Sequence, residues 1–187
     1  MASDQFVSRG GEKLQAALDQ FHIDVKDKVV LDVGSSTGGF VDCLLQNGAA
    51  KVYSVDTAYG ELAWKLRNDP GVVVMERTNI LYLESLPEKV DAITIDAGWT
   101  KLELVLPVVQ KFLKENGIII ALLKPHYEGG QKNLVKGVVP LELVEEIKNQ
   151  TIKNIQDLGF NIQGEMESPI LGGGGNKEFL LLIKLLT

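Results

Sequence analysis

The sequence predicts an α/β protein built on a doubly wound, Rossmann-like sheet of seven strands. Short apolar runs alternate with segments of helical spacing through most of the chain, which predicts a mostly parallel sheet with helices on both faces. The first apolar run ends in a glycine-rich turn, as in nucleotide-binding folds. The last two runs have no helix between them, so an antiparallel final strand is expected.

Apolar runs rich in β-branched residues are expected to form the strands. They cover residues 28–33, 51–56, 72–75, 90–96, 117–124, 161–167 and 179–186. The glycines at 172–175 join the last two runs. We therefore expect those two strands to pair as a hairpin at one edge of the sheet.

Helical spacing of apolar residues, interrupted by glycine and proline, places the helices between the strands. The expected core helices cover residues 40–47, 60–67, 102–113 and 141–158. A further helix at 9–21 precedes the first strand and carries Leu14, Ala17, Leu18 and Phe21 on one face. It is expected to be an added helix that packs on the sheet.

The length of 187 residues suits one domain, with an extension at 1–27 and a Rossmann-like core at 28–187. Cys43 is the only cysteine, which excludes an internal disulfide and a thiolate metal cluster, so no metal site is expected. No signal peptide and no apolar stretch of membrane-spanning length is recognisable, so a cytoplasmic protein without a membrane partner is expected. The net charge of −6 argues against a strong general affinity for nucleic acid, although a local basic face can still steer RNA.

The glycine-rich turn at 32–40 predicts a cofactor site. Its glycines do not follow the G-x-G-x-x-G spacing of dinucleotide-binding proteins, and Asp32 precedes them. A carboxylate there repels a pyrophosphate and favours a positively charged ligand, such as the methionine ammonium group of S-adenosylmethionine. The residues expected to contact the cofactor are Asp32, Gly34, Ser35, Thr37, Gly38, Gly39 and Phe40. A purely structural glycine turn is the alternative.

Polar residues after later strands extend this expected cofactor site. Asp56 ends the second strand and can accept hydrogen bonds from both ribose hydroxyls of an adenosine, with Thr57 beside it. Asn79 follows the third strand and either contacts the adenine edge or forms a turn. Asp96 ends the fourth strand and is expected next to the same ligand.

Four charged residues are candidates for catalysis. Asp96 and Lys124 close the fourth and fifth strands, where open α/β sheets bind ligands. Lys13 lies on the added helix and Glu178 opens the last strand. In a doubly wound sheet they can converge beside a reacting methyl group. Each also has an ordinary explanation, as a solvated charge, a helix cap or an edge-strand residue.

Several motifs resemble the TlyA or hemolysin A type of ribosomal RNA (rRNA) methyltransferase within the FtsJ-like superfamily. They are SRGGEKL at 8–14, LDVGSSTGGF at 31–40, VYSVDTAYGELAWKLRNDP at 52–70, ERTNI at 76–80, LLKPHYE at 122–128 and GGNKEFLL at 174–181. The resemblance implies S-adenosylmethionine as cofactor and 2′-O-methylation of cytidines in rRNA. It also implies a catalytic tetrad, carried here by Lys13, Asp96, Lys124 and Glu178. Family members usually carry an S4-type RNA-binding domain before this region, so the chain is expected to be the catalytic domain alone.

The chemistry of ribose methylation requires residues of these types. A 2′-hydroxyl is a poor nucleophile, and its proton must leave as the oxygen attacks the methyl group. Lys124 is expected to be the base or to stabilise the oxyanion, and Lys13 to be a second cation. Asp96 and Glu178 are expected to orient Lys124 and to tune its charge.

Two departures from the family pattern leave the substrate open. The family pattern at the end of the fourth strand is Asp-Leu-Ser-Phe, and this chain has Asp96-Ala97-Gly98-Trp99 there. Trp99 either stacks on a flipped-out base or belongs to the core. His126 and Tyr127 stand where Gln-Phe is more typical, and His126 is expected to be structural or RNA-facing. The segments 128–138 and 172–175 are expected to flank the mouth of the site. Basic candidates for RNA contact are Arg9, Lys13, Lys101, Lys132, Lys136 and Lys177.

The expected partner is ribosomal RNA or a ribosomal subunit, and both a monomer and a homodimer remain open. Two other functions also remain open at this point: a methyltransferase acting on a small molecule or protein, and a non-catalytic RNA-binding or hemolysin-like protein. The glycine spacing disfavours a dehydrogenase.

Overall fold

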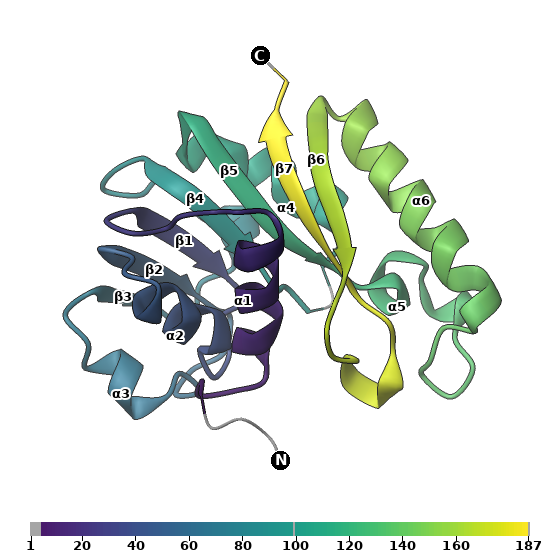
Figure 1. The fold of residues 1–187 in the computed structure, drawn as a ribbon, viewed down its shortest axis with the longest axis horizontal. Coiled ribbons are helices and arrows are strands. Elements are labelled where there is room, and N and C mark those ends of the chain that lie inside the picture. Colours follow the sequence, from purple (N-terminus) through teal and green to yellow (C-terminus); the bar gives the residue numbers. More distant parts are fainter. Residues whose placement is uncertain (1–4, 99, 187) are drawn as a thin grey trace.

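The computed structural model describes residues 5–98 and 100–186, so Trp99 lies outside the described residues. Its sheet has seven strands in the order β3-β2-β1-β4-β5-β7-β6 (Figure 1). The strands are β1 Val29–Val33, β2 Lys51–Val55, β3 Val72–Met75, β4 Val90–Ile95, β5 Leu113–Leu123, β6 Phe160–Glu167 and β7 Phe179–Leu185. Strands β1 to β5 pair in parallel, and β7 runs antiparallel to both β5 and β6. The doubly wound fold and the edge hairpin predicted from the sequence are confirmed.

Helices cover both faces of this sheet (Figure 1). They are α1 Gly10–Gln20, α2 Gly39–Gln46, α3 Trp64–Arg67, α4 Leu102–Val109, α5 Pro125–Glu128 and α6 Leu141–Asp157. Side chains from α1, α2 and α3 join one hydrophobic core, and side chains from α4 and α6 join the other. No helix in the described part of the chain combines the length and apolar character needed to cross a bilayer.

Alternating side chains of the central strands divide between these two cores. Val30 and Ala92 face the core beneath α1 and α2, whereas Leu31 and Ile93 face the core beneath α4 and α6. The strand period of two therefore buries nearly every residue of β1 and β4. This explains why both strands appear in the sequence as unbroken apolar runs.

Two expected helices are shorter in the structure. The helix expected at 60–67 is wrong in its first half: Gly60 has a φ of 79° and Ala63 is extended, so α3 begins only at Trp64. The helix expected at 102–113 ends at Val109 and continues as a 3-10 turn over Gln110–Phe112. Strand β5 then begins at Leu113, because that residue pairs with Val90 ahead of an irregularity in the β4–β5 register.

Helix α5 was not anticipated, and it begins immediately after the end of β5. Pro125 occupies its first turn, where a missing N–H is tolerated. The short helix turns the chain sharply after Lys124. As a result Lys124 lies at the carboxyl edge of the sheet, on the same side as the glycine loop between β6 and β7.

Candidate active site

The loop between β1 and α2 forms the floor of the candidate site. Gly34 has a φ of 85°, and a Cβ there would lie 2.7 Å from the carbonyl oxygen of Asp96. Only glycine therefore allows the β1 and β4 loops to approach each other so closely. Ser36 also adopts a positive φ, and its N–H donates to Asp56 Oδ2 at 2.7 Å.

A first cavity of about 430 Å³ lies at the ends of β1, β2 and β4. Asp56, Thr57 and Asn79, all expected to contact the cofactor, line it. Asp56 also accepts a hydrogen bond from the N–H of Ala58 at 2.8 Å, so its carboxylate is held in place. Asn79 Oδ1 accepts from the N–H of Leu81 at 3.0 Å, which gives Asn79 the turn-forming role as well as a place in the cavity wall.

A second cavity, also about 430 Å³, adjoins the first. Several expected residues line it: Ser35, Thr37, Gly39, Phe40, Lys13 and Lys124. Gly34, Ser36, Asp96 and Gly98 line both cavities. The two cavities therefore meet beside Asp96.

Two residues of the expected cofactor set line neither cavity. Asp32 is fully buried behind the loop, where Thr94 Oγ1 donates to its Oδ1 at 2.6 Å. Burial raises the pKa of the Asp32 carboxyl to about 7, and Oδ2 has no partner among the described residues. Gly38 has a φ of 99° at the start of α2, and a Cβ there would meet Leu66. Both residues shape the loop from behind.

Helix α1 reaches the site through close contacts between glycines. A Cβ on Gly39 would lie 2.3 Å from Ser8 Oγ and 2.8 Å from the nitrogen of Gly11. The N-terminal segment therefore packs directly against the start of α2, and the N–H of Val7 donates to the buried Asp42 at 2.8 Å. This docking places Lys13, on the next part of α1, in the wall of the second cavity.

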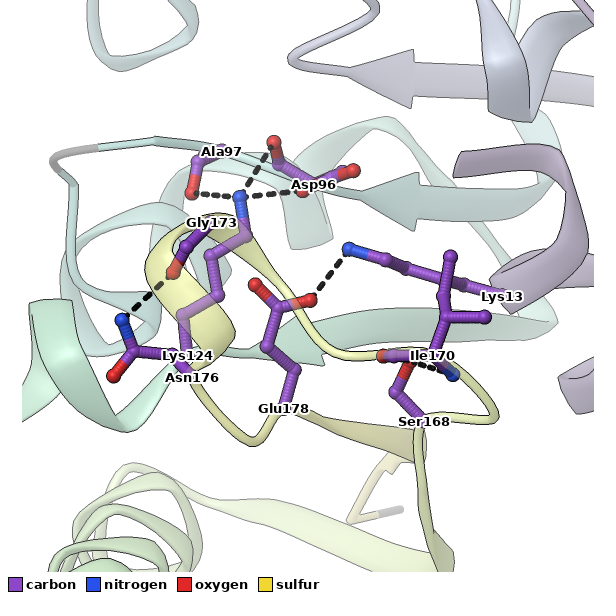
Figure 2. Close-up of polar contacts among 9 residues, drawn as sticks. All are labelled: Lys13, Asp96, Ala97, Lys124, Ser168, Ile170, Gly173, Asn176 and Glu178. Carbon is purple, nitrogen blue, oxygen red and sulfur yellow. Dashed lines mark hydrogen bonds and ion pairs between the residues drawn. The ribbon is translucent and has the colours of Figure 1, made fainter. Parts of the chain in front are cut away.

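The structure brings the four candidate catalytic residues together as two ion pairs (Figure 2). Lys124 Nζ lies 2.5 Å from Asp96 Oδ1, and Lys13 Nζ lies 2.5 Å from Glu178 Oε2. Lys124 Nζ also lies 3.5 Å from the carbonyl oxygen of Asp96 and 3.4 Å from that of Ala97. The expectation that both acids would hold Lys124 is replaced by a different pairing, in which Glu178 holds Lys13.

The Lys13–Glu178 pair is almost wholly withdrawn from solvent. The side chain of Glu178 is 3% exposed and that of Lys13 is 11% exposed. Gly172 closes over the carboxylate, since a Cβ at this position would lie 1.9 Å from Glu178 Oε1. An ion pair this deeply buried is stable only while both partners are present.

Residues 126–128 surround the end of Lys124. The ring of Tyr127 lies 5.6 Å from Lys124 Nζ, and the rings of His126 and Tyr127 are 4.2 Å apart. Burial lowers the pKa of His126, which keeps the imidazole neutral near neutral pH. Burial raises the pKa of Glu128 to about 7, and its Oε1 accepts from the N–H of Leu102 at 2.9 Å.

The candidate RNA contacts divide into two groups. Arg9 and Lys13 line the second cavity, and Lys136 lines a further cavity beside it. Lys101 instead pairs with Glu103, and Lys177 pairs with Glu167. Lys132 also lies outside these cavities and is exposed on the 3-10 turn Gln131–Asn133.

Several lining residues escaped the sequence analysis. Ser8, Gly10, Ser36, Glu61, Thr78, Gly98, Thr100 and the stretch from Ile170 to Leu171 line one or both cavities. The motifs SRGG and ERTNI carried a signal for some of them, because turn residues cluster there. No sequence pattern pointed to residues 170–171, because their place in the cavity wall depends on how the loop between β6 and β7 folds back.

The polar groups that line the two cavities fit S-adenosylmethionine. The carboxylate of Asp56 can accept hydroxyl protons of a ribose, and Asp96 lines the junction with a side chain that is 22% exposed. A carboxylate there favours a sulfonium cation over a phosphate. Gly98 leaves open space where another residue would carry a Cβ. The residues present therefore suit a nucleoside joined to a positively charged amino acid.

Comparisons with known proteins identify the family of the chain. The model of the FtsJ-like methyltransferase family matches residues 6–185. Bacillus subtilis YqxC, named as a candidate rRNA methyltransferase, is 45% identical over 95% of this chain, which spans 65% of the length of that relative. The 16S/23S rRNA (cytidine-2′-O)-methyltransferase TlyA of Mycobacterium tuberculosis is 38% identical over 97% of the chain and 69% of the relative.

A solved structure extends the likeness to three dimensions. The crystal structure of a candidate hemolysin from Lactococcus lactis superposes with a TM-score of 0.93 at 40% identity. The match covers 99% of this chain and 90% of that one. The chain belongs to the FtsJ-like methyltransferase family, which implies S-adenosylmethionine as its cofactor.

Proposed function

We propose that this chain transfers a methyl group from S-adenosylmethionine to a ribose 2′-hydroxyl of ribosomal RNA, with a cytidine as the target nucleoside. The observation that carries the proposal is the pair of lysine–carboxylate contacts around one cavity, Lys124 with Asp96 and Lys13 with Glu178. The names of the relatives from B. subtilis and M. tuberculosis support the substrate class. In this proposal residues 1–187 act as one methyltransferase domain in the cytoplasm, with the ribosomal subunit as partner.

The cofactor supplies an electrophilic methyl group on a sulfonium. Asp56, Thr57 and Asn79, which line the first cavity, would hold the adenosine portion, and Asp96, at the junction of the two cavities, would offset the charge of the sulfonium. The glycine loop, Ser35, Thr37 and Phe40, which line the second cavity, would hold the amino-acid portion. Asp32 and Gly38 contribute by fixing the shape of the loop.

Lys124 is the residue we assign to the reacting hydroxyl. In this proposal Lys124 first releases the proton of its ion pair with Asp96 to solvent. Its Nζ then accepts the 2′-hydroxyl proton while the oxygen forms its bond to the methyl carbon and the bond from carbon to sulfur breaks. The ammonium that results is stabilised by Asp96 Oδ1 and by the two adjacent carbonyl oxygens. The proton and the positive charge thus end on Lys124.

The second ion pair forms the opposite wall. Lys13 is already neutralised by Glu178, so it can donate a hydrogen bond to the acceptor ribose without adding an unpaired buried charge. Together the two lysines restrict the position of the hydroxyl. Restricting two reactants in this way supplies much of the rate of a group transfer.

Transfer of a tritiated methyl group to isolated ribosomal subunits tests the proposal. We expect incorporation into ribosomal RNA and loss of the label when the mapped target ribose lacks its 2′-hydroxyl. Label on ribosomal protein, or label retained on the 2′-deoxy substrate, would contradict it.

A further inference from the structure

A third cavity, of about 580 Å³, lies beside the two already described. One wall is α5 and the segment after it, with His126, Tyr127, Leu134 and Lys136, and the other is the glycine turn at 173–174. Gly173 lines both this cavity and the one that contains Lys13 and Lys124. The third cavity therefore adjoins the cavity that contains Lys13 and Lys124, and its size is that of a typical ligand pocket.

Asn176 fixes the two walls relative to each other. Its Nδ2 donates to the carbonyl oxygens of Gly137 at 3.0 Å and Gly173 at 2.8 Å, and its Oδ1 accepts from the N–H of Val139 at 3.0 Å. The contact with Gly173 is drawn in Figure 2. Asn176 is 3% exposed, so water does not compete for these bonds. A cavity whose walls are already joined loses little entropy when it binds a ligand.

The chemistry of the lining favours a flat aromatic ligand attached to a phosphate. The rings of His126 and Tyr127 form a tilted pair, and the imidazole is neutral because burial lowers its pKa. Aromatic side chains of this kind stack on nucleobases in single-stranded RNA. Lys136 adds a positive charge at the same cavity, and Leu134 adds apolar surface.

The short distance between Lys124 and Tyr127 indicates which nucleobase this cavity can hold. Lys124 Nζ lies 5.6 Å from the centre of the Tyr127 ring. In a nucleotide the 2′-oxygen and the base are carried on adjacent carbons of the ribose. A hydroxyl held at Lys124 therefore leaves its own base within reach of Tyr127.

We propose that the third cavity is the binding subsite for the nucleobase of the nucleotide whose ribose is methylated. This inference rests on the proposed function. It makes Tyr127 and His126 determinants of substrate binding, separate from the residues that transfer the methyl group. It also requires that the target base leave its stack before reaction.

Direct binding of small probes tests the subsite without methyl transfer. Protein saturated with S-adenosylhomocysteine is titrated with cytidine 5′-monophosphate and with ribose 5-phosphate, and saturation transfer to the ligand protons is followed by NMR. We expect cytidine 5′-monophosphate to bind about fivefold or more tightly than ribose 5-phosphate, the low end of base–aromatic stacking, with the strongest transfer at the base protons. Equal affinity for the two probes, or no binding of the nucleotide, would overturn the proposal.

Variants locate the binding. Tyr127→Ala should lower the affinity for cytidine 5′-monophosphate about fivefold or more, whereas Tyr127→Phe should retain the affinity because the aromatic ring remains. Tyr82→Ala is the matched control, since Tyr82 is 81% exposed and lines none of the three cavities. Unchanged nucleotide affinity in Tyr127→Ala would place the base elsewhere. Nucleotide binding that depends on Tyr127 in a protein that does not methylate ribosomal RNA would reject the proposed function and keep the subsite.

Discussion

The backbone of Gly172 lies directly against the carboxylate of Glu178, so that a Cβ at 172 would be 1.9 Å from Glu178 Oε1. The φ of Gly172 is −75° and its ψ is −168°, a conformation open to any residue. Glycine is therefore required here by the closeness of Glu178 and not by backbone strain. This makes Gly172 a direct means of testing the buried Lys13–Glu178 pair.

We expect Gly172→Ala to displace the Glu178 carboxylate from Lys13 and to lower the rate of methyl transfer at least tenfold, because separating a buried pair leaves uncompensated charge. Thermal unfolding and tritiated methyl transfer are the measurements. Gly173→Ala is the matched control for stability, since a Cβ there meets nothing within 4 Å. Equal melting temperatures and equal rates for Gly172→Ala and the unaltered chain would contradict the assignment.

Lys124→Ala should reduce the rate of methyl transfer by about 10²- to 10⁴-fold, the usual contribution of a positioned base. Affinity for S-adenosylmethionine should change little, because Asp56 and the glycine loop remain. Transfer assays and calorimetric titration of the cofactor measure the two effects separately. Lys153→Ala, an exposed lysine of α6, controls for loss of surface charge. Turnover retained in Lys124→Ala would remove Lys124 from the reaction.

Asp56→Asn should weaken cofactor binding by about tenfold to a hundredfold, since hydrogen bonds to a charged group contribute more than neutral ones. The asparagine keeps one oxygen for the N–H of Ala58 but loses the second acceptor that Ser36 uses. Calorimetric titration with S-adenosylmethionine gives the affinity. Asp157→Asn, at the exposed end of α6, is the control. Similar affinities for both variants would argue that Asp56 only shapes the loop.

Much of the site follows from topology alone. Asp96 and Lys124 end parallel strands that are neighbours in the sheet, so their convergence could be predicted from the order of the strands. The glycine loop and Asp56 follow by the same rule.

The pairing of charges could not be predicted in this way. Whether Glu178 holds Lys13 or Lys124 depends on how α1 docks, and that is set by contacts of Gly39 with Ser8 and Gly11 that have no periodic signal. Asn176 is a similar case. In the sequence it is one more polar residue after four glycines, whereas in the structure its amide joins two loops.

Asp32 shows the limit of arguing from charge. Its position before the glycines suggested contact with a cationic ligand, but the strand period turns its side chain into the interior beside Thr94. Burial then raises its pKa to about 7. The sequence does not reveal this, because a carboxylate at a strand end can point to the loop or beneath it.

Glu128 joins α5 to the start of α4, since its Oε1 accepts from the N–H of Leu102, and burial raises its pKa to about 7 from an ordinary 4.5. Between these two values the folded chain holds a proton that the unfolded chain has lost, so stability falls as pH rises through this window and then levels off. Glu128→Gln keeps the accepting oxygen but cannot ionise.

The unaltered chain should therefore lose up to about 3 kcal/mol of unfolding free energy, relative to Glu128→Gln, between about pH 5 and about pH 8. Urea unfolding at several pH values measures the difference. Asp32 titrates in both proteins, so its contribution cancels in the comparison. Parallel pH profiles for the two proteins would mean that Glu128 is already ionised in the folded chain, with Lys101 as a compensating charge.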